Sequence, residues 1–437
     1  MDPAVCLDYS HSPVTPEIAA LPLPRMMKAR QRFVGPEVAD VAATVRSELA
    51  RMNLAGRVQP GARVAITVGS RGIAAIPQAA AAIVAEIRGC GGDPFIVPAM
   101  GSHGSATAEG QKTILADIGV TEERVGAPIR ASMDVVELGR LPSGMPVYMD
   151  KYAREADAVI LLNRIRPHNP WGHIGSGLMK IATIGLGKQI GCNTIHAWCV
   201  GTAQLYHTIV EAYRLVCNHV PITLGVGILD NASARPGRIV ALTAEELPDK
   251  EPGLRQEADA MVPRLPFPEI DVLVLNQMGK NTSPAGLDPL VIGRPTVDPE
   301  GHPIEGQPRI GRVVVLDLTQ PSHGNAVGVG QADVITRRLA SKIDFYAMYM
   351  NGISGCRLDL VRLPLVLPTD REAIQVAALA CGIRARGTLR LVRAESTLKI
   401  GEFSLSEALV PDLKNLPHVE PLGALEPMAF DASGNIC

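Results

Sequence analysis

Four histidines of this 437-residue chain lie in or beside glycine-rich segments: His103, His168, His173 and His196. An imidazole exchanges a proton near neutral pH and also binds metals, so each is a candidate acid, base or ligand. Lys180 ends the sequence SGLMK. A lysine in such apolar, glycine-flanked surroundings can lose its proton and act as a nucleophile. These five side chains are the main chemical candidates in the sequence.

Each candidate also has a structural interpretation. A histidine in a loop is more often a hydrogen-bonded structural residue, and a lysine is more often at the surface. The glycines favour the functional interpretation, because they let the backbone approach a ligand closely. Pro170 prevents a regular helix between His168 and His173, so their spacing alone does not predict a zinc site. Arg71, in the sequence GSRG, can bind a substrate carboxylate or cap its own loop.

The signatures of several common enzyme classes are missing. The sequence has no GxGxxG for a dinucleotide, no GxxxxGK[ST] for a nucleoside triphosphate, no HExxH for zinc and no GxSxG for a nucleophilic serine. The eight cysteines are scattered with no CxxC pair, which is typical of free thiols in a cytoplasmic protein. The sequence therefore does not support an ordinary dehydrogenase, P-loop enzyme, zinc protease or α/β-hydrolase.

The composition argues against two classes of partner. Lys and Arg number 42 and Asp and Glu number 44, a net charge of −2 that lacks the basic surface of nucleic-acid-binding proteins. Aromatic residues make up 3% of the chain, too few for platforms that stack bases. No apolar run approaches the ~20 residues that span a bilayer, and the first residues lack an apolar signal segment. We therefore expect a cytoplasmic protein that binds neither nucleic acids nor membranes.

Alternating strand and helix patterns position the candidates. This alternation is typical of parallel sheets covered by helices. In such sheets ligands bind at the carboxyl ends of the strands, where the loops GSRG, GSHGSAT and RPHNPWGHIGSG lie. Strands are predicted at 63–68, 94–98, 158–163, 222–230, 271–275, 312–318 and 389–392, and helices at 77–88, 108–118, 201–220, 332–349 and 370–381.

A proline-rich break, PRLPFP at 263–268, divides the pattern. Strands alternate with helices on both sides of it, and the chain is too long for one compact core. We expect an α/β fold of two α/β domains, residues 1–264 and 265–437, with mainly parallel sheets and an active-site cleft between them.

The chemical candidates, taken in order, resemble a known family. The resemblance is to the nickel-pincer-nucleotide lactate racemases, and it covers residues 64–196 best. It implies a cofactor, pyridinium-3,5-bisthiocarboxylic acid mononucleotide, that binds nickel through one carbon and two sulfurs. The residues that carry the resemblance, with sixteen positions from the lysine to the last histidine, are Arg71, His103, His168, Lys180 and His196.

The resemblance assigns cofactor contacts to four residues. Lys180 matches a lysine that can hold the cofactor as a thioamide. Ser176 and Gly177, just before it, belong to the same cofactor site. His196 matches the nickel ligand, and an imidazole that completes a sulfur-rich set suits nickel.

The resemblance also implies the residues that act on the substrate. His103 and His168 match two catalytic histidines, with His173 as an alternative to His168. Arg71 matches an arginine that binds the substrate, and Lys280 in QMGKN is a candidate for a lysine near it. The implied reaction is the racemisation or epimerisation of a 2-hydroxy acid, with a hydride removed and returned and the two histidines as acid and base.

Three positions depart from the family pattern. Val68 stands where the family has an acidic residue, Gly104 stands where it has an arginine, and the loop with Trp171 is longer. We therefore expect a 2-hydroxy acid larger than lactate. The expected partners are this small molecule and the enzymes that synthesise the cofactor and load it into the protein.

Two other functions remain open at the level of the sequence. The first is a metal-dependent hydrolase or lyase with His103, His168 and His196 as metal ligands. The second is a non-catalytic binding protein on the same scaffold. Nickel together with a sulfur-containing chromophore would distinguish the racemase from both, because a hydrolase would hold metal without a chromophore.

Overall fold

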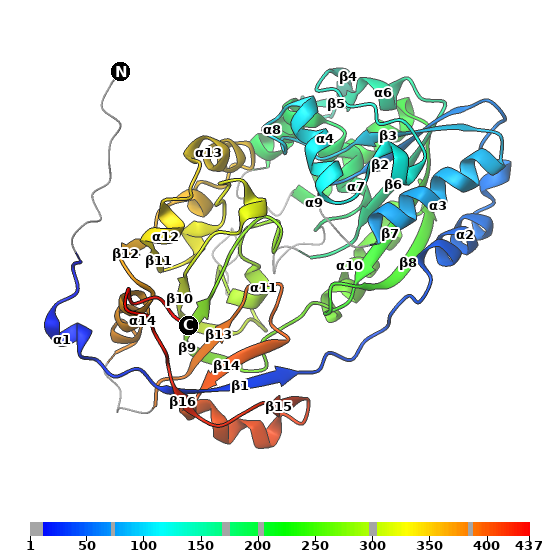
Figure 1. Cartoon of the computed structure of the whole chain (residues 1–437). Coiled ribbons are helices and arrows are strands. Elements are labelled where there is room, and N and C mark those ends of the chain that lie inside the picture. Colours follow the sequence, from blue (N-terminus) through cyan, green and yellow to red (C-terminus); the bar gives the residue numbers. More distant parts are fainter. Residues whose placement is uncertain (1–11, 71–74, 168–174, 200–204, 297–303, 383–387) are drawn as a thin grey trace, which may run out of the picture.

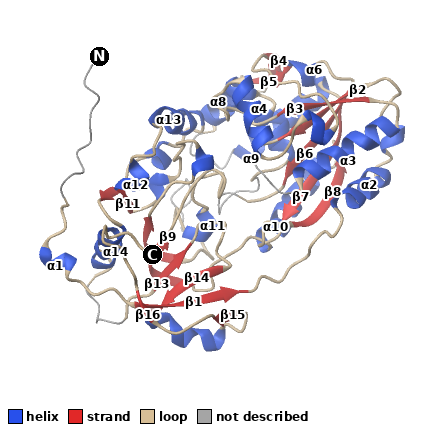
Figure 2. Ribbon diagram, in the orientation of Figure 1, coloured by secondary structure: helices blue, strands red, loops and turns tan. Residues whose placement is uncertain are grey.

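The chain forms two halves, each built on its own sheet (Figure 1). The structure is a computed structural model that describes residues 12–70, 75–167, 175–199, 205–296, 304–382 and 388–437. We call residues 36–262 the first half, and residues 12–31 with 263–437 the second half. Helices lie against both sheets (Figure 2), which confirms the predicted α/β class with mainly parallel sheets.

The sheet of the first half has the strand order β3-β2-β6-β7-β8, with β8 antiparallel to β7 and the other pairs parallel. Successive strand residues face opposite sides, so Val64 packs with helices α2 and α3, whereas Ala65 packs with α9 and α10. The strands are β2 (Arg63–Val68), β3 (Asp93–Pro98), β6 (Ala158–Arg164), β7 (Ile222–Asp230) and β8 (Pro236–Thr243).

A hairpin and a set of helices complete the first half. The hairpin joins β4 (Val135–Arg140) to β5 (Pro146–Asp150). None of the helices in the described residues is both long and apolar enough to cross a membrane. The helices are α2 (Val41–Arg51), α3 (Ile76–Gly89), α4 (Ala108–Asp117), α5 (Glu122–Val125), α6 (Lys151–Arg154), α9 (Leu205–His219) and α10 (Leu247–Ala260), besides those of the site.

The sheet of the second half is parallel at one end and antiparallel at the other. Its order is β12-β11-β10-β9-β13-β14-β1-β15, and β16 also pairs with β1. The parallel strands are β9 (Glu269–Leu275), β10 (Arg309–Val315), β11 (Val334–Thr336), β12 (Leu365–Leu367) and β13 (Leu391–Ala394). The antiparallel strands are β1 (Arg25–Gln31), β14 (Glu402–Ser406), β15 (Val419–Pro421) and β16 (Glu426–Pro427).

Strand β1 differs from the predicted division of the chain. The sequence assigned everything up to residue 264 to the first domain, but β1 pairs with β14 and β15 of the second sheet. Its alternate residues Met27 and Ala29 are buried in the core of the second half. The proline-rich break marks one crossing between the halves, whereas the earlier crossing, after Gln31, carries no comparable signal.

The single helix predicted at 332–349 is wrong. The structure has strand β11 there, then α12 (Arg337–Ala340) and α13 (Phe345–Ser354). Thr336 Oγ1 accepts a hydrogen bond from Leu339 N, and Asp344 Oδ1 accepts one from Ala347 N, so each side chain starts a new helix. The second half also contains α1 (Pro16–Ala19), α11 (Pro289–Ile292) and α14 (Asp370–Leu379).

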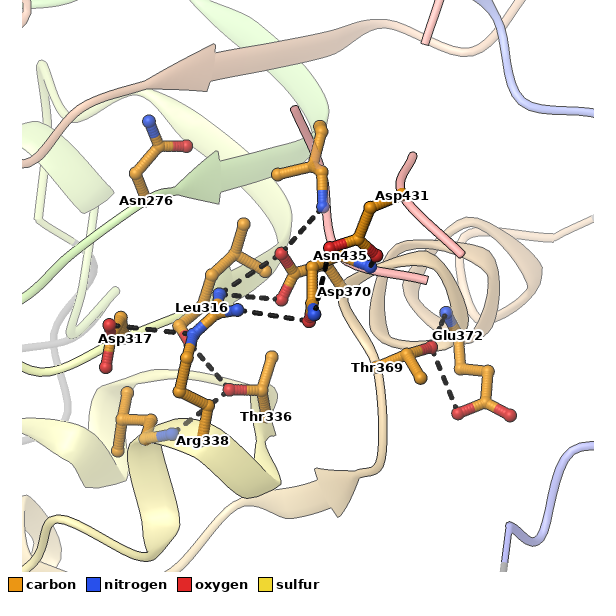
Figure 3. A network of polar contacts seen from close by, with 12 residues as sticks. Asn276, Leu316, Asp317, Thr336, Arg338, Thr369, Asp370, Glu372, Asp431 and Asn435 are labelled. Atoms are coloured by element: carbon orange, nitrogen blue, oxygen red, sulfur yellow. Dashed lines mark hydrogen bonds and ion pairs between the residues drawn. The ribbon is translucent and has the colours of Figure 1, made fainter. Parts of the chain in front are cut away.

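A polar network fastens the last described residues to the second sheet (Figure 3). Arg338 donates to both carboxylate oxygens of Asp370 at 2.9 and 3.1 Å and to Asn435 Oδ1 at 3.0 Å. Asp370 Oδ2 also accepts the backbone N–H of Ile436 at 3.0 Å. The network thus joins α12, α14 and the C-terminal segment at the carboxyl ends of the parallel strands.

One buried ion pair links the two halves. Arg166 follows β6 of the first half, and Asp288 precedes α11 of the second half. Arg166 Nη2 donates to Asp288 Oδ2 at 2.9 Å, and both side chains are buried. Asp288 Oδ1 also accepts the N–H of Leu290. Because a buried charge without its partner is costly, this pair strongly favours the observed arrangement of the halves.

We expect Asp288→Asn to lower the free energy of unfolding by about 3–5 kcal/mol, because it leaves the Arg166 guanidinium buried without a charge partner. Glu402→Gln is the matched control, since it breaks the exposed Arg30–Glu402 pair. We expect the control to cost less than about 1 kcal/mol. Urea unfolding of both variants measures the difference, and equal costs would contradict the proposed importance of the buried pair.

Candidate active site

A cavity of about 360 Å³ lies between the two halves. The first half contributes loops at the carboxyl ends of β2, β3 and β6, which is where parallel sheets bind ligands. The second half contributes the segment after β9 and residues in and after α13. Five residues predicted from the sequence line this cavity: His103, Ser176, Lys180, His196 and Lys280.

His103 lies in the loop after β3, beside the loop after β2. Its Nδ1 is 2.5 Å from Ser70 Oγ, a hydrogen bond between the ends of two adjacent parallel strands. Ser102 in the same loop also lines the cavity. The bond to Ser70 fixes the orientation of the imidazole at the cavity wall.

A buried polar chain holds the His103 loop in place. Gln111 Nε2 donates to the carbonyl oxygens of Gly101 at 2.9 Å and His103 at 3.3 Å. Gln111 Oε1 in turn accepts from Lys188 Nζ, which lies 3.2 Å from the Asp150 carboxylate. Burial raises the pKa of Asp150 and lowers the pKa of Lys188, and their mutual attraction opposes both shifts.

Lys180 ends the short helix α7 (Leu178–Lys180), which continues into a π-helical turn, η2 (Ile181–Gly185). A Cβ at Gly185 would lie 2.6 Å from the carbonyl oxygen of Ala99. The glycine therefore lets this turn pack directly on the loop that carries His103. Burial lowers the pKa of the Lys180 ammonium, so this lysine releases its proton more easily than an exposed lysine does.

Glu251 of α10 anchors the start of α7. Its two carboxylate oxygens accept the N–H groups of Leu178 at 3.1 Å and Met179 at 2.9 Å. Burial raises the pKa of Glu251 to about 7, although the two backbone donors oppose this shift. Gly177 is needed here, because a Cβ at this position would lie 1.8 Å from Glu251 Oε1. Gly177, predicted to bind the cofactor, is not among the described cavity-lining residues.

His196 lies in helix α8 (Lys188–Trp198), not at the predicted loop tip. Its Nδ1 is 2.8 Å from the carbonyl oxygen of Cys192, which can only accept, so Nδ1 carries the hydrogen and Nε2 carries the lone pair. Burial lowers the pKa of His196 to about 4, and the charge of Lys180 contributes to the shift. The side chain is therefore a neutral imidazole with a fixed tautomer, the form that binds metals.

Lys280 lies on the side of the cavity that the second half provides. Its Nζ donates to the carbonyl oxygen of Pro284 at 2.6 Å and to Asn351 Oδ1 at 2.8 Å. Its backbone N–H donates to Ser322 Oγ. Asn351 lies in α13 and also lines the cavity. These contacts hold the ammonium group at the end of β9, opposite the first half.

The other residues singled out in the sequence are not among the described residues that line the cavity. Arg71, His168, His173 and Trp171 lie outside the described residues. Val68 is buried in the core of the first half and does not line the cavity. Gly104 has a φ of +67°, and a Cβ there would lie 2.5 Å from the backbone of Gly110. Gly104 therefore serves close backbone packing and does not enlarge the cavity.

The charge of the cavity wall is one-sided. Among the described lining residues there is no Asp or Glu. Four basic side chains line it instead, so the cavity attracts anions. The described residues also contain no group of three His, Cys, Asp or Glu side chains that could hold a metal ion. The four basic residues are Arg164, Lys180, Lys280 and Arg357.

Sequence reasoning missed several residues of the site. Ser70 and Ser102 lie in loops that the sequence did single out as glycine-rich ends of strands. Asn351 gave no local signal, because only the folding of the second half brings it to Lys280. Glu251 gave none either, since its partners are the backbone N–H groups of residues more than seventy positions earlier.

The fold and the cavity define a two-part α/β protein with a site suited to small anions. A sequence model of the lactate racemase N-terminal domain matches residues 16–205, so this part of the chain is similar to that domain. The match confirms the resemblance found in the sequence. It spans β1, the strands β2 to β6, and helices α7 and α8 with Lys180 and His196.

The chain is also similar to a solved structure. This structure is the lactate racemase apoprotein from Thermoanaerobacterium thermosaccharolyticum, with 12% identity and a TM-score of 0.47. The alignment covers 82% of this chain and 96% of that chain. A comparison with curated proteins finds no match.

The raised pKa of Glu251 predicts a pH-dependent stability. The folded protein holds this proton up to about pH 7, whereas the unfolded chain releases it near the ordinary glutamate pKa of 4.5. The folded state therefore binds more protons in this window, and this contribution to stability falls as the pH rises from about 4.5 to 7.

Glu251→Gln removes this contribution, because glutamine does not titrate. We expect the stability of the variant relative to the wild type to rise by up to about 3 kcal/mol across that window. Urea unfolding at several pH values measures it. Glu257→Gln, which removes a partly exposed carboxylate from the same helix, controls for net charge. A difference that does not change with pH would contradict the role of Glu251.

Proposed function

We propose that this protein is a racemase or epimerase of 2-hydroxy acids that uses a nickel-pincer nucleotide. The observation that carries the proposal is the presence of both Lys180 and His196 on a cavity whose described lining residues include no Asp or Glu. The match of residues 16–205 to the lactate racemase N-terminal domain supports the same assignment. The proposal includes a cytoplasmic location and loading by the enzymes that synthesise the cofactor.

The residues present fit this cofactor. His196 offers the Nε2 lone pair of a neutral imidazole, which is the form that a nickel ligand requires. Lys180 has the lowered pKa that thioamide formation at its amine needs. The remaining nickel ligands would come from the cofactor itself. The basic lining suits both the phosphate of a mononucleotide and a carboxylate substrate.

The protein's own residues would handle binding and proton transfer. When bound, the cofactor supplies the acceptance and return of a hydride. His103, held by Ser70, takes the proton of the substrate hydroxyl while the hydrogen leaves Cα, which gives a 2-oxo acid. His168 acts as acid and base for the other enantiomer. Arg71 and Lys280 bind the substrate carboxylate.

Because the cofactor would take the hydride and the histidines only a hydroxyl proton, the reaction avoids the removal of a proton from Cα. Direct removal of a Cα proton beside an ionised carboxylate would place two negative charges on adjacent atoms. Transfer of a hydride avoids the carbanion, so the histidines need to move only a hydroxyl proton. Imidazole has a pKa near working pH and suits this task.

We expect His196→Ala, made alongside the cofactor-synthesis enzymes, to contain at least about tenfold less nickel than the wild type, because the imidazole ligand is lost. Alanine favours helix α8, so the fold should persist. His219→Ala is the matched control, since His219 Nδ1 makes the same contact to the carbonyl oxygen four residues earlier, in α9. Elemental analysis decides, and full nickel retention in His196→Ala would move the ligand role elsewhere.

The reaction is tested with single enantiomers of 2-hydroxy acids in deuterated water. We expect the loaded protein to invert a 2-hydroxy acid with little deuterium at Cα, because a returned hydride does not exchange with water. Chirality and isotope content are read from the same sample. Extensive Cα exchange would indicate direct proton abstraction, and metal without a chromophore would favour a hydrolase or lyase.

A further inference from the structure

Arg164 is the last residue of β6 and lines the cavity beside Asn163. It is only 8% exposed. Its Nη1 lies 3.7 Å from Asp230 Oδ2, an ion pair longer than a hydrogen bond. Its Nε and Nη2 are buried and have no hydrogen-bond partner among the described residues. A buried guanidinium with two unsatisfied donors is costly unless something else accepts their hydrogens.

The two unsatisfied atoms form one recognition edge. The N–H bonds of Nε and Nη2 are parallel, and this edge of arginine binds both oxygens of a carboxylate or phosphate at once. Arg357 also lines the cavity, and in this residue the same edge is occupied by a carboxylate. Its Nε and Nη2 donate to the two carboxylate oxygens of Asp359 at 2.8 and 2.7 Å. The same edge of Arg164 has no such acceptor among the described residues.

Asp230 does not fill the position. It faces Nη1, away from the parallel edge, and its own Oδ1 is also unsatisfied. Arg166 lies close by but is engaged with Asp288. Burial lowers the pKa of Arg164 to about 10, which leaves the guanidinium charged at neutral pH. Arg164 is therefore a buried cation at the cavity with its bidentate edge unused.

We propose that Arg164 binds an oxyanion of a ligand in this cavity, a carboxylate or a phosphate held by Nε and Nη2 once the ligand displaces the atoms that cover this edge. The proposed function suggests two sources of that group. One is a second acidic group at the far end of the 2-hydroxy acid, and the other is the phosphate of the nucleotide cofactor. The choice between these sources depends on the proposed function, whereas the oxyanion site itself does not.

The test uses the full chain without cofactor and two probes, succinate and ribose 5-phosphate, in calorimetric titrations. Arg164→Lys keeps the charge but removes the parallel edge. Arg357→Lys is the matched control, because its edge is already occupied by Asp359. We expect Arg164→Lys to weaken binding of at least one probe by about tenfold to hundredfold, and the control to change it by less than about threefold.

The two probes distinguish the sources. A loss confined to succinate assigns Arg164 to a diacid substrate, and a loss confined to ribose 5-phosphate assigns it to the cofactor phosphate. Failure of the wild type to bind either probe would overturn the proposal, as would equal losses in both variants or no loss in Arg164→Lys. None of these titrations needs nickel, so failure of the racemase function would be seen separately.

A second variant covers the case in which Arg164→Lys does not fold. Asp230→Asn leaves the Arg164 edge intact and removes the nearby negative charge. We expect it to bind the favoured probe more tightly than the wild type does, because repulsion between Asp230 and the probe is lost. Unchanged or weaker binding by folded Asp230→Asn would contradict the proposal. Thermal unfolding of each variant establishes that it is folded.

Discussion

The buried pair of Arg166 and Asp288 is the contact on which the geometry of the site depends. Arg166 also exchanges backbone hydrogen bonds with Ser176, which leads into the helix of Lys180. Asp288 is at the end of the segment that follows β9 and contains Lys280. A single ion pair thus connects the Lys180 wall of the cavity to the Lys280 wall. Because the pair is buried, dissolved salt screens its attraction less than it screens the attraction in surface ion pairs.

The carboxylates near the site follow a common arrangement. Asp150 faces Lys188, Asp288 faces Arg166, and Glu251 faces two backbone N–H groups. None of these three residues lines the cavity, and each contacts a group that helps to hold a lining segment in place. The lining itself keeps basic groups and no described carboxylate. Structural support and positive charge at the cavity are in this way provided by different residues.

The sequence predicted local structure well and long-range pairing poorly. The bounds of β2 and β7 agree with the predicted strands, because continuous apolar runs between glycine and proline define buried strands. The cavity between two halves and the presence of Lys180 and His196 on it also agree with the expected architecture. The roles of these residues in catalysis stay predictions.

Most of the features that the sequence did not predict depend on residues far apart in the chain. Nothing in the sequence of β1 states that it pairs with β14. The error at 332–349 is local instead, because the capping residues Thr336 and Asp344 lie inside an apolar segment that fits a single helix. Lys280 and Asn351, or Glu251 and α7, meet only in the folded chain. Periodicity reports the burial of a segment and not the identity of its neighbours.

The place of β1 has a consequence for biosynthesis. Met26 pairs with Ser406, so the strand leaves the ribosome long before its neighbour is made. The first half, inserted between β1 and β9, can complete its own sheet during this time. The second sheet closes around β1 only near the end of translation. The cavity, which needs both halves, is therefore assembled last, so a nascent chain cannot bind a ligand there before most of its sequence has been synthesised.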